Sequence, residues 1–121
     1  MPRVIHFEIL ADEPQRALAF YEKVFGWKYT KWEGPMDYWS VTTGKDDEPG
    51  INGAIMPRTQ KGSVYNTIDV PSVEVFIEKV VQAGGTVLMK KVAVPGVGFM
   101  AYCADTEGNT FGVMEKTPGP H

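Results

Sequence analysis

The 121-residue sequence predicts an α+β fold in which two βαβββ modules form a curved mixed sheet with a cleft. Three observations support this fold class. Residues 4–27 have the pattern of a strand, a helix and a glycine stop, and the same order returns from residue 64. The two halves also end in matching segments, 50–56 and 108–114. One βαβββ unit leaves a sheet face uncovered, so we expect both halves to belong to a single domain spanning residues 1–121.

The first module is expected over residues 3–57. Its opening strand alternates apolar and polar side chains, which is typical of a half-buried strand and places His6 and Glu8 on one face. Apolar residues then recur every three or four positions, which predicts an amphipathic helix from Pro14 that ends at Gly26. Strands are expected at residues 4–10, 27–32, 38–43 and 51–56.

The second module is expected over residues 63–115, after a polar linker at residues 58–62. Its helix begins at Pro71 and Ser72 and ends before two consecutive glycines. Residues 116–121 are predicted to form a frayed tail. Strands are expected at residues 64–70, 86–92, 99–104 and 110–115.

Composition argues against several classes of partner. Hydrophobic residues make up 43% of the chain and the formal net charge is −3, which is usual for a soluble domain. Lysine and arginine are scattered, so the basic patch of a nucleic-acid-binding protein is missing. No apolar run approaches the ~20 residues of a membrane span, and no signal peptide is evident. The single cysteine, Cys103, cannot form an internal disulfide. We therefore expect a cytoplasmic protein with neither nucleic-acid nor membrane partners.

Three motifs carry a family resemblance. They are V-x-H-F-E-I at residues 4–9, A-x-x-F-Y-x-x-V-F-G-W at residues 17–27 and D-x-E-G-N-x-F-G at residues 105–112. With the duplicated βαβββ pattern and the turn at residues 95–98, the chain resembles the vicinal oxygen chelate superfamily. This superfamily includes glyoxalase I, bleomycin-resistance proteins and extradiol dioxygenases. The closest branch is a bacterial and archaeal one usually labelled only as glyoxalase-related. The resemblance implies a homodimer.

The resemblance also implies where metal ligands would lie, because family enzymes take one from the first and one from the last strand of each half. These positions fall on His6, Tyr65, Ala54 and Gly112. Alanine and glycine have no donor side chain, whereas a catalytic divalent site normally needs about three protein ligands. We therefore expect no complete metal site and no cofactor. A divalent metal held by His6, Glu8 and a further carboxylate such as Asp69 remains the alternative.

Two residues are candidates for catalysis, His6 and Glu8. His6 can act as a general base or hydrogen-bond donor, with Glu8 holding the imidazole in one tautomer; an ordinary hydrogen-bonded strand pair is the competing interpretation. Side chains expected to line a pocket are Tyr65, Thr67, Trp39, Ala54, Met56, Met100, Tyr102, Gly112 and Met114. Alternation alone does not decide whether Trp39 and Tyr102 face the cleft or the core.

Two functions follow from this pattern. The first is a small-molecule-binding protein of the glyoxalase/bleomycin-resistance type with a degenerate metal site, which takes an apolar or aromatic ligand. The alternative is a lyase, isomerase or dioxygenase that depends on a divalent metal or on His6 as base. The fold hosts both kinds of protein, so the resemblance leaves open whether the chain is an enzyme.

Overall fold

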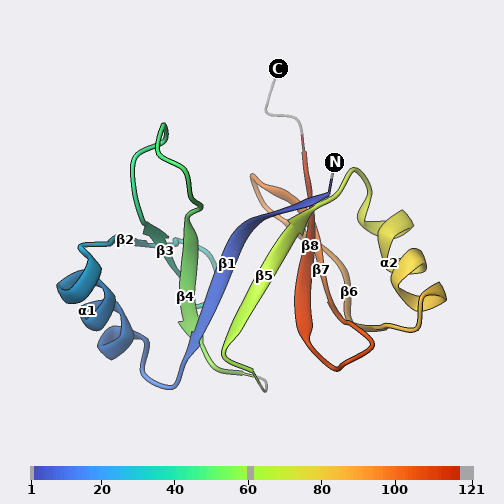
Figure 1. Cartoon of the computed structure of the whole chain (residues 1–121), viewed down its shortest axis with the longest axis horizontal. Coiled ribbons are helices and arrows are strands. Elements are labelled where there is room, and N and C mark those ends of the chain that lie inside the picture. The colour runs from blue at the N-terminus through green and yellow to red at the C-terminus, as the bar shows by residue number, and fades with distance from the viewer. Residues whose placement is uncertain (1, 60–61, 118–121) are drawn as a thin grey trace. The chain divides into compact units, whose positions relative to one another are not determined.

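The structure, a computed structural model, describes residues 2–59 and 62–117 (Figure 1). The chain divides into two compact units. The first unit comprises His6–Tyr65, and the second comprises Met1–Ile5 together with Asn66–His121. Among the described residues, no helix has the length and apolar character needed to cross a membrane.

The first unit contains a mixed sheet with strand order β2-β3-β4-β1. β1 and β4 are parallel, whereas the other neighbouring strands are antiparallel. Helix α1 covers one face of this sheet, where Leu18 is buried against Val41 and Ile55. The elements are β1 (Arg3–Ala11), α1 (Pro14–Phe25), β2 (Lys28–Lys31), β3 (Trp39–Thr42) and β4 (Gly53–Pro57).

The second unit repeats this arrangement, with strand order β5-β8-β7-β6 and a parallel β5–β8 pair. Helix α2 contributes the fully buried Val73 to a core with Ala101 and Val113. The elements are β5 (Val64–Asp69), α2 (Val73–Gln82), β6 (Thr86–Val94), β7 (Gly98–Ala104) and β8 (Thr110–Lys116). The predicted α+β class and the predicted βαβββ repeat are confirmed.

The strand before the linker starts later than predicted, at Gly53 instead of Ile51. The Thr43 hydroxyl donates to the Ile51 carbonyl at 2.7 Å, and the Thr43 amide donates to Asn52 Oδ1 at 2.9 Å. These hydrogen bonds replace the backbone–backbone bonds of a sheet at residues 51–52, because the backbone groups concerned are already paired with side chains.

The ends of the predicted linker and tail also differ from the sequence pattern. The Arg58 amide donates to the Ala11 carbonyl at 2.9 Å, and the Arg58 guanidinium bonds to Asp12 and to the Gly62 carbonyl. The linker is therefore anchored to the end of β1. β8 includes Lys116, which was predicted to belong to the frayed tail, and residues 60–61 and 118–121 lie outside the described part of the chain.

Candidate functional site

A hydrogen-bonded network joins three side chains of the first unit. Glu8 and His6 lie two residues apart on β1, and Tyr38 directly precedes β3. The Tyr38 hydroxyl donates to Glu8 Oε2 at 3.0 Å, and His6 Nε2 lies 2.8 Å from the same hydroxyl oxygen. A phenol carries one proton, which goes to the carboxylate, so His6 Nε2–H must be the donor to Tyr38. The Tyr38 hydroxyl thus links Glu8 to His6, and the control of the His6 tautomer by Glu8 stays a prediction.

Burial determines the charge state of Tyr38 and the cost of the Glu8 charge in this network. Glu8 is 4% exposed, and a buried carboxylate is costly unless donors surround it. The Tyr38 hydroxyl supplies one such donor. Burial, and then the charge and hydrogen bond of Glu8, raise the pKa of Tyr38 well above its ordinary value. Tyr38 is therefore a neutral donor at physiological pH. Its ring is held by Trp32, which packs edge-on at 6.0 Å between ring centroids.

Sheet register places the predicted pocket residues of the first unit. Ala54 pairs with Glu8 on one side and with Ser40 on the other, so these three residues share one face. Met56 pairs with Leu10 on that same face. Trp39 has the opposite parity and is buried in the core formed with Leu18 of α1. The structure therefore places Trp39 in the core and not beside the network, because side chains alternate between the two faces of a strand.

The second unit brings most of its predicted pocket residues together. Gly112 pairs with Thr67 and with Tyr102 across its two neighbouring strands, so all three lie on the face opposite α2. A Cβ atom at position 112 would lie 3.2 Å from Thr67 Oγ1 and 3.5 Å from the Tyr102 ring. Met100 and Met114 pair with each other on the same face. Register thus settles the orientation of Tyr102, which the sequence left open.

The comparisons with known proteins agree with this architecture. The family model of the Glyoxalase/Bleomycin resistance protein/Dioxygenase superfamily matches residues 3–113. The chain belongs to this superfamily. It is 31% identical over 114 residues to "Putative glyoxylase CFP32" of Mycobacterium tuberculosis and of Mycobacterium bovis, a match that covers 92% of this chain. The chain spans only 43% of the length of these curated relatives.

Solved structures share the fold at low sequence identity. A hypothetical protein from Bacillus halodurans C-125 matches with a TM-score of 0.73 and 15% identity, over 99% of this chain and 98% of that one. A variant of Streptomyces coelicolor methylmalonyl-CoA epimerase in complex with 2-nitronate-propionyl-CoA matches with a TM-score of 0.71 and 11% identity, over 98% and 97%. At these identities the likeness shows the fold alone.

Register also makes the internal repeat of this superfamily member explicit. The pair Glu8–Ala54 corresponds to the pair Thr67–Gly112, because each joins the first and last strands of its unit. His6 then corresponds to Tyr65. By the same register, Tyr38 corresponds to Met100. The Glu8–Tyr38–His6 network belongs to the first half of the repeat. The corresponding positions of the second half carry a hydroxyl, a phenol and a thioether, from Thr67, Tyr65 and Met100.

The four positions that the resemblance assigns to a metal do not fit one. Ala54 and Gly112 offer no donor, and Tyr65, of which only 3% is exposed, carries a phenol. His6 donates its Nε2–H to Tyr38, so that nitrogen is not free to bind a metal. Across residues 2–59 and 62–117, no three His, Cys, Asp or Glu side chains form a group that could hold a metal ion.

Tyr38 is the site residue that sequence reasoning missed. The sequence marked it only as an aromatic residue in a strand. Tyr38 and Ser40 are two residues apart, so their side chains point to the same face of the sheet, and Ser40 pairs with Ala54. This two-residue spacing was the one feature of the sequence that could have placed Tyr38 on the face of Ala54. The pairing of β3 with β4 is needed to use that signal, because strand parity alone does not say which neighbour a side chain meets.

Proposed function

We propose that the chain is a small-molecule-binding protein of the glyoxalase/bleomycin-resistance type with a degenerate metal site. The observation that carries this proposal is the Tyr38 hydroxyl that bridges Glu8 and His6. Such a network provides directional polar groups on a sheet face without a metal. The small side chain of Ala54 next to Glu8 leaves more space on that face than a ligating residue would.

The charge of the network favours a neutral ligand. Glu8 is a buried carboxylate, so an anionic group placed beside it would be repelled in a medium of low dielectric constant. A neutral ligand with a hydroxyl group and an apolar body avoids this cost. Because both donor hydrogens of the network are used within it, the ligand should donate a hydrogen bond. We therefore expect uncharged aromatic alcohols to bind better than aromatic carboxylates.

The binding proposal is tested with ligand-observed NMR, using benzyl alcohol and benzoate as probes of similar size. Benzyl alcohol, whose hydroxyl can donate to the imidazole or carboxylate acceptors of the network, is expected to bind the wild type, and His6→Ala is expected to weaken that binding at least about tenfold, the value of one good hydrogen bond. Lys28→Ala, at an exposed position of β2, is the control and should leave binding unchanged. Equal binding by wild type and His6→Ala, or stronger binding of benzoate, would contradict the proposal.

A metal titration tests the degenerate metal site separately. We expect protein purified without an affinity tag to contain no stoichiometric metal, and calorimetry with Ni, Zn, Fe(II) and Mn to show no tight binding, because two of the four family positions lack donors. Stoichiometric metal that is lost in His6→Ala would overturn this part of the proposal and would support the metal-dependent enzyme.

The same network supports a second candidate, proton transfer with His6 as base. In this reaction the imidazole accepts a C–H proton next to a carbonyl, the electron pair remains as an enolate, and a solvent proton returns to the carbon. Carboxylate–phenol–imidazole contacts can stabilise the imidazolium that forms. Hydroxyacetone in D₂O is the probe: deuterium incorporation at carbon that His6→Ala abolishes supports an enzyme, and a rate equal to that of buffer argues against it.

The homodimer implied by the resemblance remains a prediction, as does the cytoplasmic location. Helix α1 carries three apolar side chains that are more than half exposed, Phe20, Val24 and Phe25. Sedimentation equilibrium of the purified chain measures the oligomeric state directly.

A further inference from the structure

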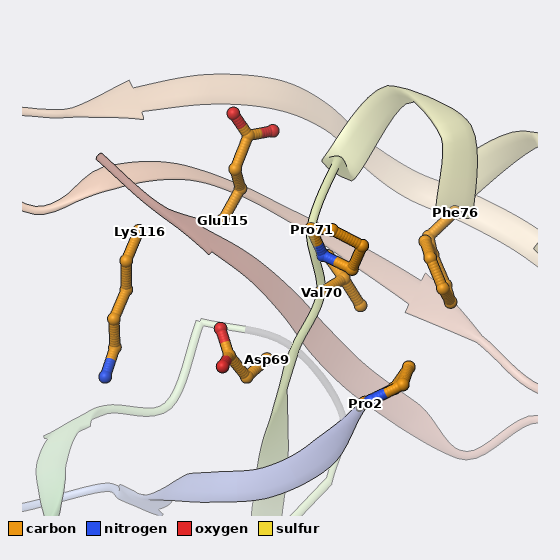
Figure 2. A pocket seen from close by; sticks show the side chains of 7 residues that line it. All are labelled: Pro2, Asp69, Val70, Pro71, Phe76, Glu115 and Lys116. Carbon is orange, nitrogen blue, oxygen red and sulfur yellow. The ribbon is translucent and has the colours of Figure 1, made fainter. Parts of the chain in front are cut away.

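A hollow of about 490 Å³ opens in the second unit at the start of helix α2 (Figure 2). It contains none of the residues of the His6 network. Two of its sides come from the carboxyl ends of β5 and β8, which run parallel to each other. Ligands commonly bind beyond the carboxyl ends of parallel strands, where the chain turns into a helix. The residues that line the hollow are Pro2, Asp69, Val70, Pro71, Phe76, Glu115 and Lys116.

The two carboxylates of the hollow, Glu115 and Asp69, differ in their hydrogen-bond partners. Glu115 Oε1 accepts from the Val73 amide at 3.0 Å, so this carboxylate caps the first turn of α2. Ser72 provides a second cap by accepting from the Val75 amide at 3.3 Å. Asp69 is half-buried, and its carboxylate has no hydrogen-bond or ion-pair partner among residues 2–59 and 62–117. Two amides of the first turn of α2 thus have side-chain acceptors, and Asp69 is the carboxylate of the hollow that takes no part in capping.

The side chains that line the hollow are apolar at one end and charged at the other. Figure 2 shows the rings of Phe76 and Pro2 at one end of the hollow, Lys116 at the other, and Asp69 between them. Lys79 Nζ lies 4.7 Å from the centroid of the Phe76 ring, so one face of that ring already meets a cation. A ligand cation is therefore expected at Asp69, with its apolar part against Phe76 and Pro2.

We propose that this hollow binds a small organic ammonium ion that carries an apolar group. The ammonium would pair with Asp69, and the apolar group would fill the end lined by Phe76 and Pro2. Charge-assisted hydrogen bonds to a half-buried carboxylate are stronger than neutral ones, so ammonium ligands should bind more tightly than neutral or anionic ligands of the same shape. Lys116 carries a like charge at the far end and should weaken binding slightly. This site is independent of the function proposed for the His6 network.

Phenethylamine and 3-phenylpropionate are the probes, because they share a phenyl group and a two-carbon chain but carry opposite charges. Both are titrated into ¹⁵N-labelled wild-type chain at low salt and followed through amide shifts. Phenethylamine is expected to bind with a Kd on the order of 1 mM and to shift the amides of Val70, Ser72 and Val73. The carboxylate probe should bind at least about tenfold more weakly.

Two substitutions with opposite expected signs complete the test. Asp69→Asn should weaken phenethylamine binding at least about tenfold, whereas Lys116→Gln should strengthen it about twofold. Asp47→Asn, in an exposed loop of the first unit, makes the same charge change and should have no effect. Amide dispersion shows whether each variant is folded. The proposal is overturned if 3-phenylpropionate binds as well as phenethylamine, if Lys116→Gln weakens amine binding, or if the shifts cluster outside the hollow.

Discussion

Tyr38→Phe is expected to weaken benzyl alcohol binding at least about tenfold and to lower the free energy of unfolding by about 1–3 kcal/mol at neutral pH. The substitution removes only the hydroxyl that donates to Glu8 and accepts from His6. Glu8 stays buried in this variant but loses one hydrogen-bond donor. A buried carboxylate without its donor lowers the stability of the folded state, because its lost hydration is no longer compensated. Equilibrium urea unfolding, together with the NMR titration above, measures both effects.

The pH dependence of this variant distinguishes the network from simple packing. The pKa of Tyr38 is raised in the folded state, so its contribution to stability is complete below the ordinary phenol pKa and is lost as the pH rises above it. Between about pH 10 and pH 11 the unfolded chain loses a proton that the folded chain keeps, which costs the wild type about 1 kcal/mol. Tyr38→Phe lacks this cost, so the stability difference between the two proteins should narrow over that interval.

Tyr29→Phe is the matched control, because Tyr29 lies on β2 with 41% of its surface exposed. It makes the same chemical change outside the network and should alter neither binding nor stability by more than about 0.5 kcal/mol. If Tyr38→Phe behaved like Tyr29→Phe in all three measurements, the network would have no role in binding or in folding.

Gly98→Ala is expected to cost about 3–5 kcal/mol of unfolding free energy, the largest stability effect predicted for this chain. Gly98 begins β7 with a φ of 151°, which side chains rarely adopt. An added Cβ would collide with the Glu115 carbonyl oxygen and lie 2.8 Å from the Thr117 amide. These are backbone atoms, which cannot rotate away as the end of a side chain can. A shift of Glu115 would also disturb its bond to the Val73 amide at the start of α2.

Gly96→Ala, two residues earlier, separates conformational strain from collision. Gly96 also has a positive φ, 78°, but a Cβ there would meet nothing within 4 Å. It should therefore cost only about 1–2 kcal/mol, the usual penalty of a left-handed alanine. Urea unfolding of both variants measures the difference. Equal costs would show that backbone conformation alone, and not the contact with β8, requires glycine at position 98.

Several features were determined by the sequence itself. Alternation in the first strand placed His6 and Glu8 on one face, and the helical stripe ending at Gly26 predicted α1. The turn at residues 95–98 and the matching closing segments, 50–56 and 108–114, predicted the second half in the same way. These are local features, because the periods of strands and helices and the conformations open to glycine depend on neighbouring residues. The sequence could therefore predict the α+β class, the repeat and the family.

Strand pairing decided the rest. Tyr38 joined the network and Trp39 joined the core because β3 pairs with β4 in a register that the local pattern does not contain. Asp69 came to line a hollow while Glu115 capped α2, because β5 and β8 end side by side. Contacts between residues 30 or more positions apart depend on the free energy of the whole packed sheet, and a shift of one residue would reverse every side chain. For that reason the tertiary structure, and not the sequence pattern, determined which polar groups meet.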